Sequence, residues 1–150
     1  MATIEAYINM NSSDFLAILT VRYSSDRLPG KVLANVAGKP LMQWIIERVS
    51  NPQTGIGADV VVATPGDPSN DPIEKLCQKI GIPCYRHNSD RDVVSEMDAI
   101  VQKYNPKFVT RLLGDCCFIA PETPRRVIHC LKKYPDKDLL FYFIPSWVNP

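Results

Sequence analysis

Apolar residues in this chain form short continuous runs, separated by segments in which apolar positions recur at helical spacing. Residues 15–21 (FLAILTV) make the clearest run, which has the length of a strand and no charged position. A run of this kind is typical of a strand covered on both faces. Similar segments predict further strands at residues 59–64, 83–86, 107–112 and 139–144.

The segments between these runs predict four helices. One opens at Pro40, and the others span residues 71–81, 91–104 and 122–134. Asp71 is placed to cap the second helix, with Glu74 completing a capping box. Pro72 then occupies its first turn, and Gly81 ends it. The predicted inward-facing residues are Leu41, Trp44, Ile45 and Val49 in the first helix, Val94, Met97 and Val101 in the third, and Val127, Cys130 and Leu131 in the fourth.

This alternation of strands and helices predicts one α/β domain. Strands separated by helices form a mainly parallel sheet with helices on both faces, a three-layer α/β/α arrangement. We expect residues 1–14, which are polar and aperiodic, to be a flexible N-terminal arm and residues 15–150 to be the domain. Ligands of such sheets bind outside the carboxyl ends of the strands, so the loops there are the first place to look for chemistry.

Composition narrows the function classes. The 150 residues are 45% apolar and 22% charged with a formal net charge of +1, values typical of a folded soluble domain. The small net charge gives no reason to expect a nucleic-acid partner, and no apolar run approaches the roughly 20 residues of a membrane helix. We therefore expect neither nucleic acid nor membrane as a partner.

The N-terminal residues and the cysteines indicate a cytoplasmic protein. The first 21 residues contain no Lys or Arg, so they do not resemble a secretory signal. An odd number of irregularly spaced cysteines is typical of reduced thiols rather than of a disulfide framework, and without a C-x-x-C pair we expect no structural zinc site. The five cysteines are Cys77, Cys84, Cys116, Cys117 and Cys130.

The loop after the first strand, residues 22–31 (RYSSDRLPGK), concentrates positive charge. It holds three of the chain's 17 cations and one of its 16 anions, a local charge of +2, which leaves 14 cations and 15 anions elsewhere. Ser24 and Ser25 add hydroxyl groups, and Gly30 allows close approach of the backbone. Arg and Lys at this edge suit a polyphosphate, although charge alone is more typical of a solvated basic loop. The loop matches neither a Walker motif nor a dinucleotide fingerprint.

The sequence of this loop resembles a motif of a known protein family. Residues 21–33 read VRYSSDRLPGKVL, residues 37–44 read AGKPLMQW, and residues 109–116 read VTRLLGDC. In this order and spacing they resemble the CMP-sugar-forming cytidylyltransferases, most closely the spore-coat polysaccharide group, over residues 15–135. The resemblance implies a Rossmann-like fold, the N-terminal portion of the nucleotide-diphospho-sugar transferase fold.

The resemblance also implies an activity and a set of site residues. It implies binding of CTP and Mg²⁺ and transfer of CMP to the hydroxyl of a sugar acceptor in polysaccharide biosynthesis, with a homodimer as the family's usual assembly. Lys31 and Arg22 would be the catalytic residues, because they would stabilise the charge that develops on the leaving pyrophosphate. The implied nucleotide-binding residues are Arg22, Ser25, Arg27, Gly30, Lys31, Arg86 and Ser89, of which Arg86 and Ser89 would contact the base, and the implied metal ligand is Asp115.

The chain departs from the family pattern in places. Val21 stands where the family commonly has Ala, and Asp26 replaces a residue that is usually Thr. Cys117 and Ala120 stand where the group has Pro and Asp. Family members are also considerably longer, and their second half carries the sugar pocket. Two alternatives therefore stay open: a non-catalytic nucleotide-binding domain, and a nucleotide-sugar glycosyltransferase with residues 90–92 (DRD) on magnesium.

Overall fold

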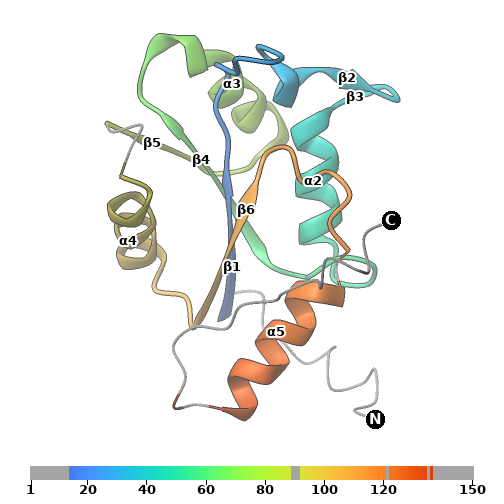
Figure 1. Cartoon of the computed structure of the whole chain (residues 1–150), viewed down its shortest axis with the longest axis vertical. Helices are drawn as coiled ribbons and strands as arrows, with labels where there is room; N and C mark the ends of the chain where they lie inside the picture. The colour runs from blue at the N-terminus through green and yellow to red at the C-terminus, as the bar shows by residue number, and fades with distance from the viewer. Residues whose placement is uncertain (1–13, 89–91, 121, 135, 137–150) are drawn as a thin grey trace.

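The computed structural model describes residues 14–88, 92–120, 122–134 and 136. Its centre is a parallel four-stranded sheet with the order β5-β4-β1-β6 (Figure 1). Ala17 on β1 lies opposite Val60 on β4 and Thr110 on β6, so β1 has a partner on each side. The strands are β1 (Phe15–Thr20), β4 (Asp59–Pro65), β5 (Cys84–His87) and β6 (Phe108–Leu113).

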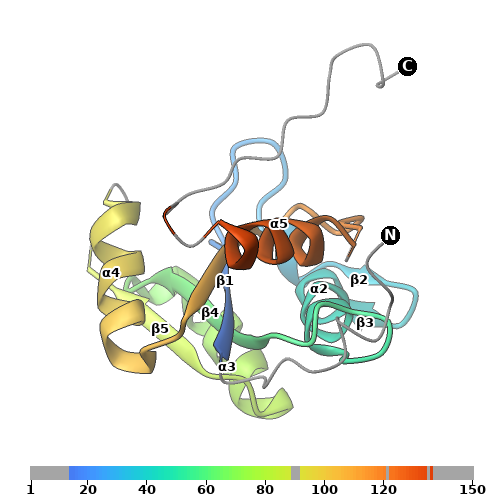
Figure 2. The same ribbon diagram turned by 90° about the horizontal axis from the view of Figure 1, so that it is seen from below.

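Helices cover both faces of this sheet, which confirms the predicted α/β class. Figure 2 shows α4 on one side and α2 and α3 on the other, with α5 beside the β6 end. The helices are α2 (Leu41–Ser50), α3 (Asp71–Ile80), α4 (Val93–Tyr104) and α5 (Glu122–Lys133), and two short 3₁₀ turns are η2 (Lys31–Leu33) and η3 (Pro68–Asn70). The strand predicted at 139–144 and the arm predicted at 1–14, apart from Asp14, lie outside the described residues.

Alternation along β1 divides the core between these two layers. Phe15, Ala17 and Leu19 pack in one cluster with α2 and α3, whereas Leu16 and Ile18 pack in a second cluster with Ile100 of α4. Every apolar residue of β1 is buried, because successive side chains point to opposite faces and each face is covered by helices. The same alternation decides which side chains at the strand ends face the cleft described below.

Two of the predicted helix faces were partly wrong. In α2 the buried residues are Met42, Ile45, Ile46 and Val49, while Trp44 is 37% exposed. The indole packs outward because its Nε1–H donates to the carbonyl oxygen of Val36 at 2.7 Å. In α4 Val94 is 79% exposed, and the buried positions are Glu96 and Ile100. Met97 is half-buried against Ile100, in agreement with the prediction.

The start of α3 also differs from the prediction. Asp71 does not cap the helix; the preceding Asn70 occupies the cap position without a side-chain bond to the helix backbone. Asp67 instead caps the 3₁₀ turn η3 by accepting a hydrogen bond from the Ser69 backbone N–H at 3.0 Å. Gly81 ends α3 as predicted, with φ of 71°, a left-handed conformation that glycine adopts without strain.

A short antiparallel hairpin that the sequence pattern did not indicate precedes α2. It consists of β2 (Asn35–Val36) and β3 (Lys39–Pro40), each only two residues long. Ala37 and Gly38 form its turn with positive φ values, and Asn35 Oδ1 accepts a hydrogen bond from the Gly38 N–H at 2.9 Å. Within the part of the chain that the structure describes, we find no helix with the length and apolar character needed to cross a membrane.

Candidate functional site

A cleft of about 410 Å³ opens at the carboxyl ends of the parallel strands, where ligands bind in sheets of this kind. One wall is the loop 22–31 after β1, and the other is the turn after β6. The predicted site residues that line it are Arg22, Ser25, Arg27, Lys31 and Asp115. The fold therefore brings together side chains that are far apart in the sequence.

The loop 22–31 closes on itself through Tyr23 and Gly30. The Gly30 N–H donates to the Tyr23 carbonyl oxygen at 2.8 Å. Gly30 has φ of 71°, and a Cβ there would lie 3.2 Å from the Tyr23 ring, so both the turn and the close packing favour glycine. Ser25 Oγ accepts a longer bond, 3.4 Å, from the Leu28 N–H. Gly30 thus shapes the loop, whereas the cations beside it face the cleft.

Lys31 and Asp115 join the two walls. Lys31 Nζ lies 2.9 Å from Asp115 Oδ2, and the Asp115 side chain is half exposed. This hydrogen bond, together with the charges of Lys31 and Arg27, outweighs partial burial and lowers the pKa of Asp115 below its usual range. Asp115 is therefore a carboxylate at neutral pH, directly beside the cationic loop.

Tight packing holds the turn that carries Asp115. The Gly114 N–H donates to the Thr20 carbonyl oxygen at 3.1 Å and so ties the turn to β1. A Cβ on Gly114 would lie 2.5 Å from Val21 Cγ1 and 3.1 Å from Val32 Cγ1. The valine at position 21, a departure from the family pattern, is thus accommodated against a glycine.

The inner end of the cleft contains a buried polar cluster that sequence reasoning did not assign as a whole. His87, from β5, and Glu96, from α4, have side chains only 9% and 3% exposed, with His87 Nε2 3.3 Å from Glu96 Oε2. Among the described residues, neither His87 ring nitrogen nor Glu96 Oε1 has a hydrogen-bond partner. Burial raises the pKa of Glu96, while the nearby His87 and Arg111 oppose that rise. The sequence did carry one signal for this cluster, because His87 lies between Arg86 and Ser89, the two residues that the resemblance places at the base.

Asp26 also lines the cleft, so the anion that replaces the family's usual threonine lies among the cations. Two other predicted positions differ from these. Ser89 lies outside the described residues. Arg86 neighbours His87 on β5, and because side chains alternate along a strand it faces the α3 side rather than the cleft.

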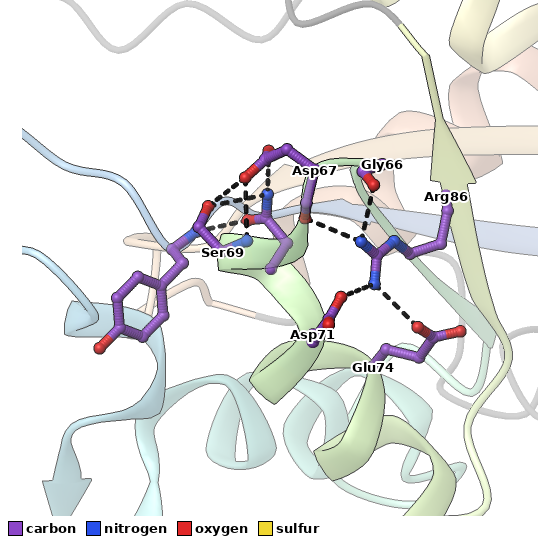
Figure 3. Close-up of polar contacts among 8 residues, drawn as sticks. Gly66, Asp67, Ser69, Asp71, Glu74 and Arg86 are labelled. Carbon is purple, nitrogen blue, oxygen red and sulfur yellow. Dashed lines mark hydrogen bonds and ion pairs between the residues drawn. The ribbon is translucent and has the colours of Figure 1, made fainter.

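Arg86 makes four hydrogen bonds on that opposite face (Figure 3). Its Nη1 donates to Asp71 Oδ1 and Glu74 Oε2, each at 2.8 Å. Its Nη2 donates to the backbone carbonyl oxygens of Gly66 and Asp67, at 2.9 and 2.8 Å. The guanidinium is therefore occupied within the protein, and the predicted contact with a base is untested.

The metal-binding capacity of the cleft rests on Asp115. Among the described residues there is no group of three or more His, Cys, Asp or Glu side chains that could enclose a metal ion. A single carboxylate nevertheless fits Mg²⁺, which proteins commonly hold through one or two carboxylates together with substrate phosphates. Asp115 is ionised, half exposed and placed in the cleft wall. The donor set thus fits magnesium delivered with a polyphosphate better than a permanently enclosed ion.

The chain is similar in sequence to cytidylyltransferases from several bacteria. The chain is 32% identical over 113 residues to 3-deoxy-manno-octulosonate cytidylyltransferase of Idiomarina loihiensis, covering 75% of this chain and 44% of that protein. It is 31% identical over 123 residues to the enzyme of the same name from Colwellia psychrerythraea, covering 79% and 41%. The chain thus spans less than half the length of these relatives.

Two solved structures share the fold. A cytidylyltransferase from Leptospira borgpetersenii superimposes with a TM-score of 0.71 at 23% identity, over 80% of this chain and 49% of the other. A CMP:2-keto-3-deoxy-manno-octonic acid synthetase solved with CTP gives 0.68 at 27% identity, over 81% and 48%. The family model for cytidylyltransferases matches residues 16–146, nearly the whole chain. With its parallel sheet and its cationic loop facing Asp115, this chain belongs to the cytidylyltransferase family.

Proposed function

We propose that the cleft binds CTP, with the triphosphate along loop 22–31 and the nucleoside toward His87 and Glu96. The observation that carries this proposal is the convergence of Arg22, Arg27 and Lys31 with Asp115 around one cleft. Arg provides planar donor pairs for phosphate oxygens and Lys a compact charge. Membership of the cytidylyltransferase family supports CTP as the nucleotide.

The proposed reaction is transfer of CMP to a sugar hydroxyl in polysaccharide biosynthesis. The hydroxyl oxygen forms a bond to the α-phosphorus of CTP, the bond from that phosphorus to the β-phosphate oxygen breaks, and pyrophosphate leaves. The hydroxyl proton passes to solvent. Little covalent chemistry is asked of the protein, so positioning and neutralisation of charge supply most of the rate. Arg22 and Lys31 would stabilise the charge that develops on the pyrophosphate.

Magnesium fits this proposal through Asp115. The ion, when bound with CTP, would neutralise phosphate charge and help to orient the α-phosphate. The protein contributes an ionised carboxylate, because Lys31 keeps the pKa of Asp115 low. Lys31 would then hold Asp115 in place before the nucleotide arrives.

A nucleotide-binding domain without turnover is the second candidate. It is favoured by Asp26, because this carboxylate lines the cleft beside the cations of loop 22–31 and would repel a triphosphate. The glycosyltransferase alternative loses support at Asp92. This carboxylate is already occupied as the cap of α4, accepting from the Ser95 N–H at 3.0 Å and from its hydroxyl at 2.6 Å.

The test is a calorimetric titration of the chain with CTP, UTP and ATP, each with and without Mg²⁺. We expect saturable binding of CTP, strengthened by Mg²⁺. Lys31→Ala and Arg27→Ala should each weaken CTP binding by about one to two orders of magnitude, the value of one or two charge-assisted contacts. Lys79→Ala, which removes one cation from the exposed face of α3, is the matched control and should leave affinity unchanged.

Absence of saturable nucleotide binding at millimolar concentration would contradict the proposal. Unchanged affinity in both loop variants would remove the loop from the site. A pyrophosphate-release assay with a panel of acidic sugars then separates the two candidates, because binding without release across the panel supports the non-catalytic domain.

A further inference from the structure

The backbone of Tyr23 connects loop 22–31, the proposed phosphate loop, to the segment 66–71 between β4 and α3. On one side its carbonyl oxygen accepts the Gly30 N–H at 2.8 Å, which closes loop 22–31. On the other side its N–H donates to Asn70 Oδ1, also at 2.8 Å. Tyr23 directly follows Arg22, the first cation of the loop. The position of the loop on the sheet is thus tied to one side chain of the segment between β4 and α3.

The Asn70 side chain is itself held in one orientation. The residue is 1% exposed, and its Nδ2 donates to Asp67 Oδ2 at 2.5 Å. The other Asp67 oxygen accepts from the Ser69 N–H at 3.0 Å and from the Ser69 hydroxyl (Figure 3). With the amide nitrogen bound to a carboxylate, the amide oxygen has to face Tyr23. The buried amide is therefore fully used, as buried polar groups in folded proteins generally are.

Arg86 holds the segment that carries Asn70. Its Nη2 binds the carbonyl oxygens of Gly66 and Asp67, and its Nη1 binds Asp71 and Glu74 of α3. One guanidinium thus joins both ends of the segment 66–71 to β5. A lysine cannot reproduce this arrangement, because its single ammonium group lacks the planar fork that reaches acceptors in two directions.

We infer that Asn70 is a positioning residue for the phosphate loop and that Arg86 is its support. The inference deepens the proposed function: the Arg86–Asn70–Tyr23 network pre-forms the loop in which Arg22, Arg27 and Lys31 meet a triphosphate. Preorganised donors avoid the cost of ordering flexible side chains at the moment of binding. Arg86 would thus support nucleotide binding from the opposite face of the sheet, without contacting the nucleotide.

The test uses Asn70→Ala and the milder Arg86→Lys in the full chain. Ile73→Val is the matched control, because Ile73 is fully buried in the same helix α3 and its truncation weakens the core without removing a hydrogen bond of Arg86, Asn70 or Tyr23. The first readout needs no nucleotide: the rate at which trypsin cleaves after Arg22, Arg27 and Lys31. We expect faster cleavage at these sites in Asn70→Ala and Arg86→Lys than in Ile73→Val. Each variant is digested at the same number of degrees below its own thermal midpoint, so that global unfolding contributes equally.

The second readout is the affinity for CTP compared with CMP. Because the ordered loop would contact the triphosphate, its loss should lower the affinity for CTP about tenfold. The affinity for CMP should change by less than about twofold. Equal weakening of CTP and CMP would show a merely structural role and overturn the inference. So would loop cleavage no faster than in the Ile73→Val control, even if the wild-type chain bound no CTP. The failure of the proposed function and the failure of this inference are therefore distinguishable.

Discussion

At the scale of single residues, the cleft wall depends on the absence of a side chain at Gly114. Its backbone φ is not in the left-handed region, so the requirement for glycine is steric rather than conformational. The two valine methyl groups at positions 21 and 32 fill the volume that a side chain would need. The turn bearing Asp115 is close to β1 because this space is shared between a glycine and two valines.

We predict that Gly114→Ala lowers the free energy of unfolding by about 1–3 kcal/mol through overpacking. Val21→Ala removes the methyl group that lies 2.5 Å from the new Cβ, so the double variant should be more stable than the sum of the two single effects. Urea denaturation of the four proteins measures this coupling. Strict additivity would mean that the turn moves away from Val21 instead.

A second residue-scale prediction concerns Asp26. Asp26→Asn removes the anion from the cleft wall and should strengthen CTP binding by about two- to fivefold, the usual value of a solvated charge interaction. Asp59→Asn makes the same charge change at an exposed position, at the amino end of β4 and away from the cleft, and should leave the affinity for CTP unchanged. Calorimetric titration at low ionic strength measures both. Equal affinities for wild type and Asp26→Asn would show that this carboxylate does not face the phosphates.

At the scale of elements, the periodicity predicted where helices occur better than which side they bury. In α4 the Ser95 N–H donates to the Asp92 carboxylate, which caps the helix so that it starts at Val93. The buried residues of α4 are Glu96 and Ile100, whereas Val94 is exposed. A buried glutamate breaks the apolar pattern, and no spacing rule could reveal it. In α2 the exposed Trp44 depends on the hairpin, whose two-residue strands leave no periodic signal.

The residues that line the cleft were predictable only in part. The motifs at residues 22–31 and 114–115 follow two strands of one parallel sheet, so it was predictable that Arg22, Arg27 and Lys31 would line the same cleft as Asp115. Their roles in binding stay predictions. The face of β5 that Arg86 occupies was not predictable, because the sequence position of a residue in a short strand does not say which side of the sheet its side chain faces. Its position opposite Asp71 and Glu74 depends on packing between α3 and β5, which is a tertiary property.

Glu96 gives a prediction about pH. Burial raises the pKa of this carboxyl in the folded protein above the ordinary value of about 4.3, so the folded state binds the proton more tightly than the unfolded chain does. The resulting stability is present below pH about 4.3 and is lost as pH rises through the raised pKa. Glu96→Gln keeps a neutral side chain, so its stability relative to wild type should increase from pH 4 toward neutrality.

Urea denaturation at several pH values measures this difference, and Glu47 supplies a contrasting control. Hydrogen bonds from Lys39 and Gln43 lower the pKa of Glu47, so its contribution is present above the ordinary pKa and is lost as pH falls. Glu47→Gln should therefore change stability with the opposite slope. A flat difference between Glu96→Gln and wild type would mean that Glu96 titrates equally in the folded and unfolded states.

At the scale of the whole molecule, charge is distributed unevenly. The net charge of +1 is the sum of +2 on loop 22–31 and −1 on the rest of the chain. A localised positive field in a cleft attracts an anionic ligand, and added salt screens it over a Debye length of about 10 Å at 0.1 M. The ligand-facing charge, rather than the net charge, determines how the protein responds to ionic strength.

We therefore predict that the affinity for CTP falls steadily as the NaCl concentration is raised about tenfold, from about 50 to about 500 mM. Lys31→Ala should show a shallower dependence, because one of the screened contacts is already missing. Calorimetry across the series measures both slopes. Identical slopes in the two proteins would place the triphosphate away from Lys31.

The middle position of β1 in the sheet has a consequence for how the protein is made. β1 is translated before the other strands of the sheet, but the residues that pair with Ala17, Val60 and Thr110, follow much later in the chain. At about 5–20 residues per second, roughly 5–20 s pass between translation of β1 and that of β6. Throughout that interval the apolar segment Phe15–Leu19 of β1 is present in the nascent chain with at least one edge unpaired. The strand that carries loop 22–31 at its carboxyl end is therefore the one that we expect to need protection from aggregation for longest during synthesis.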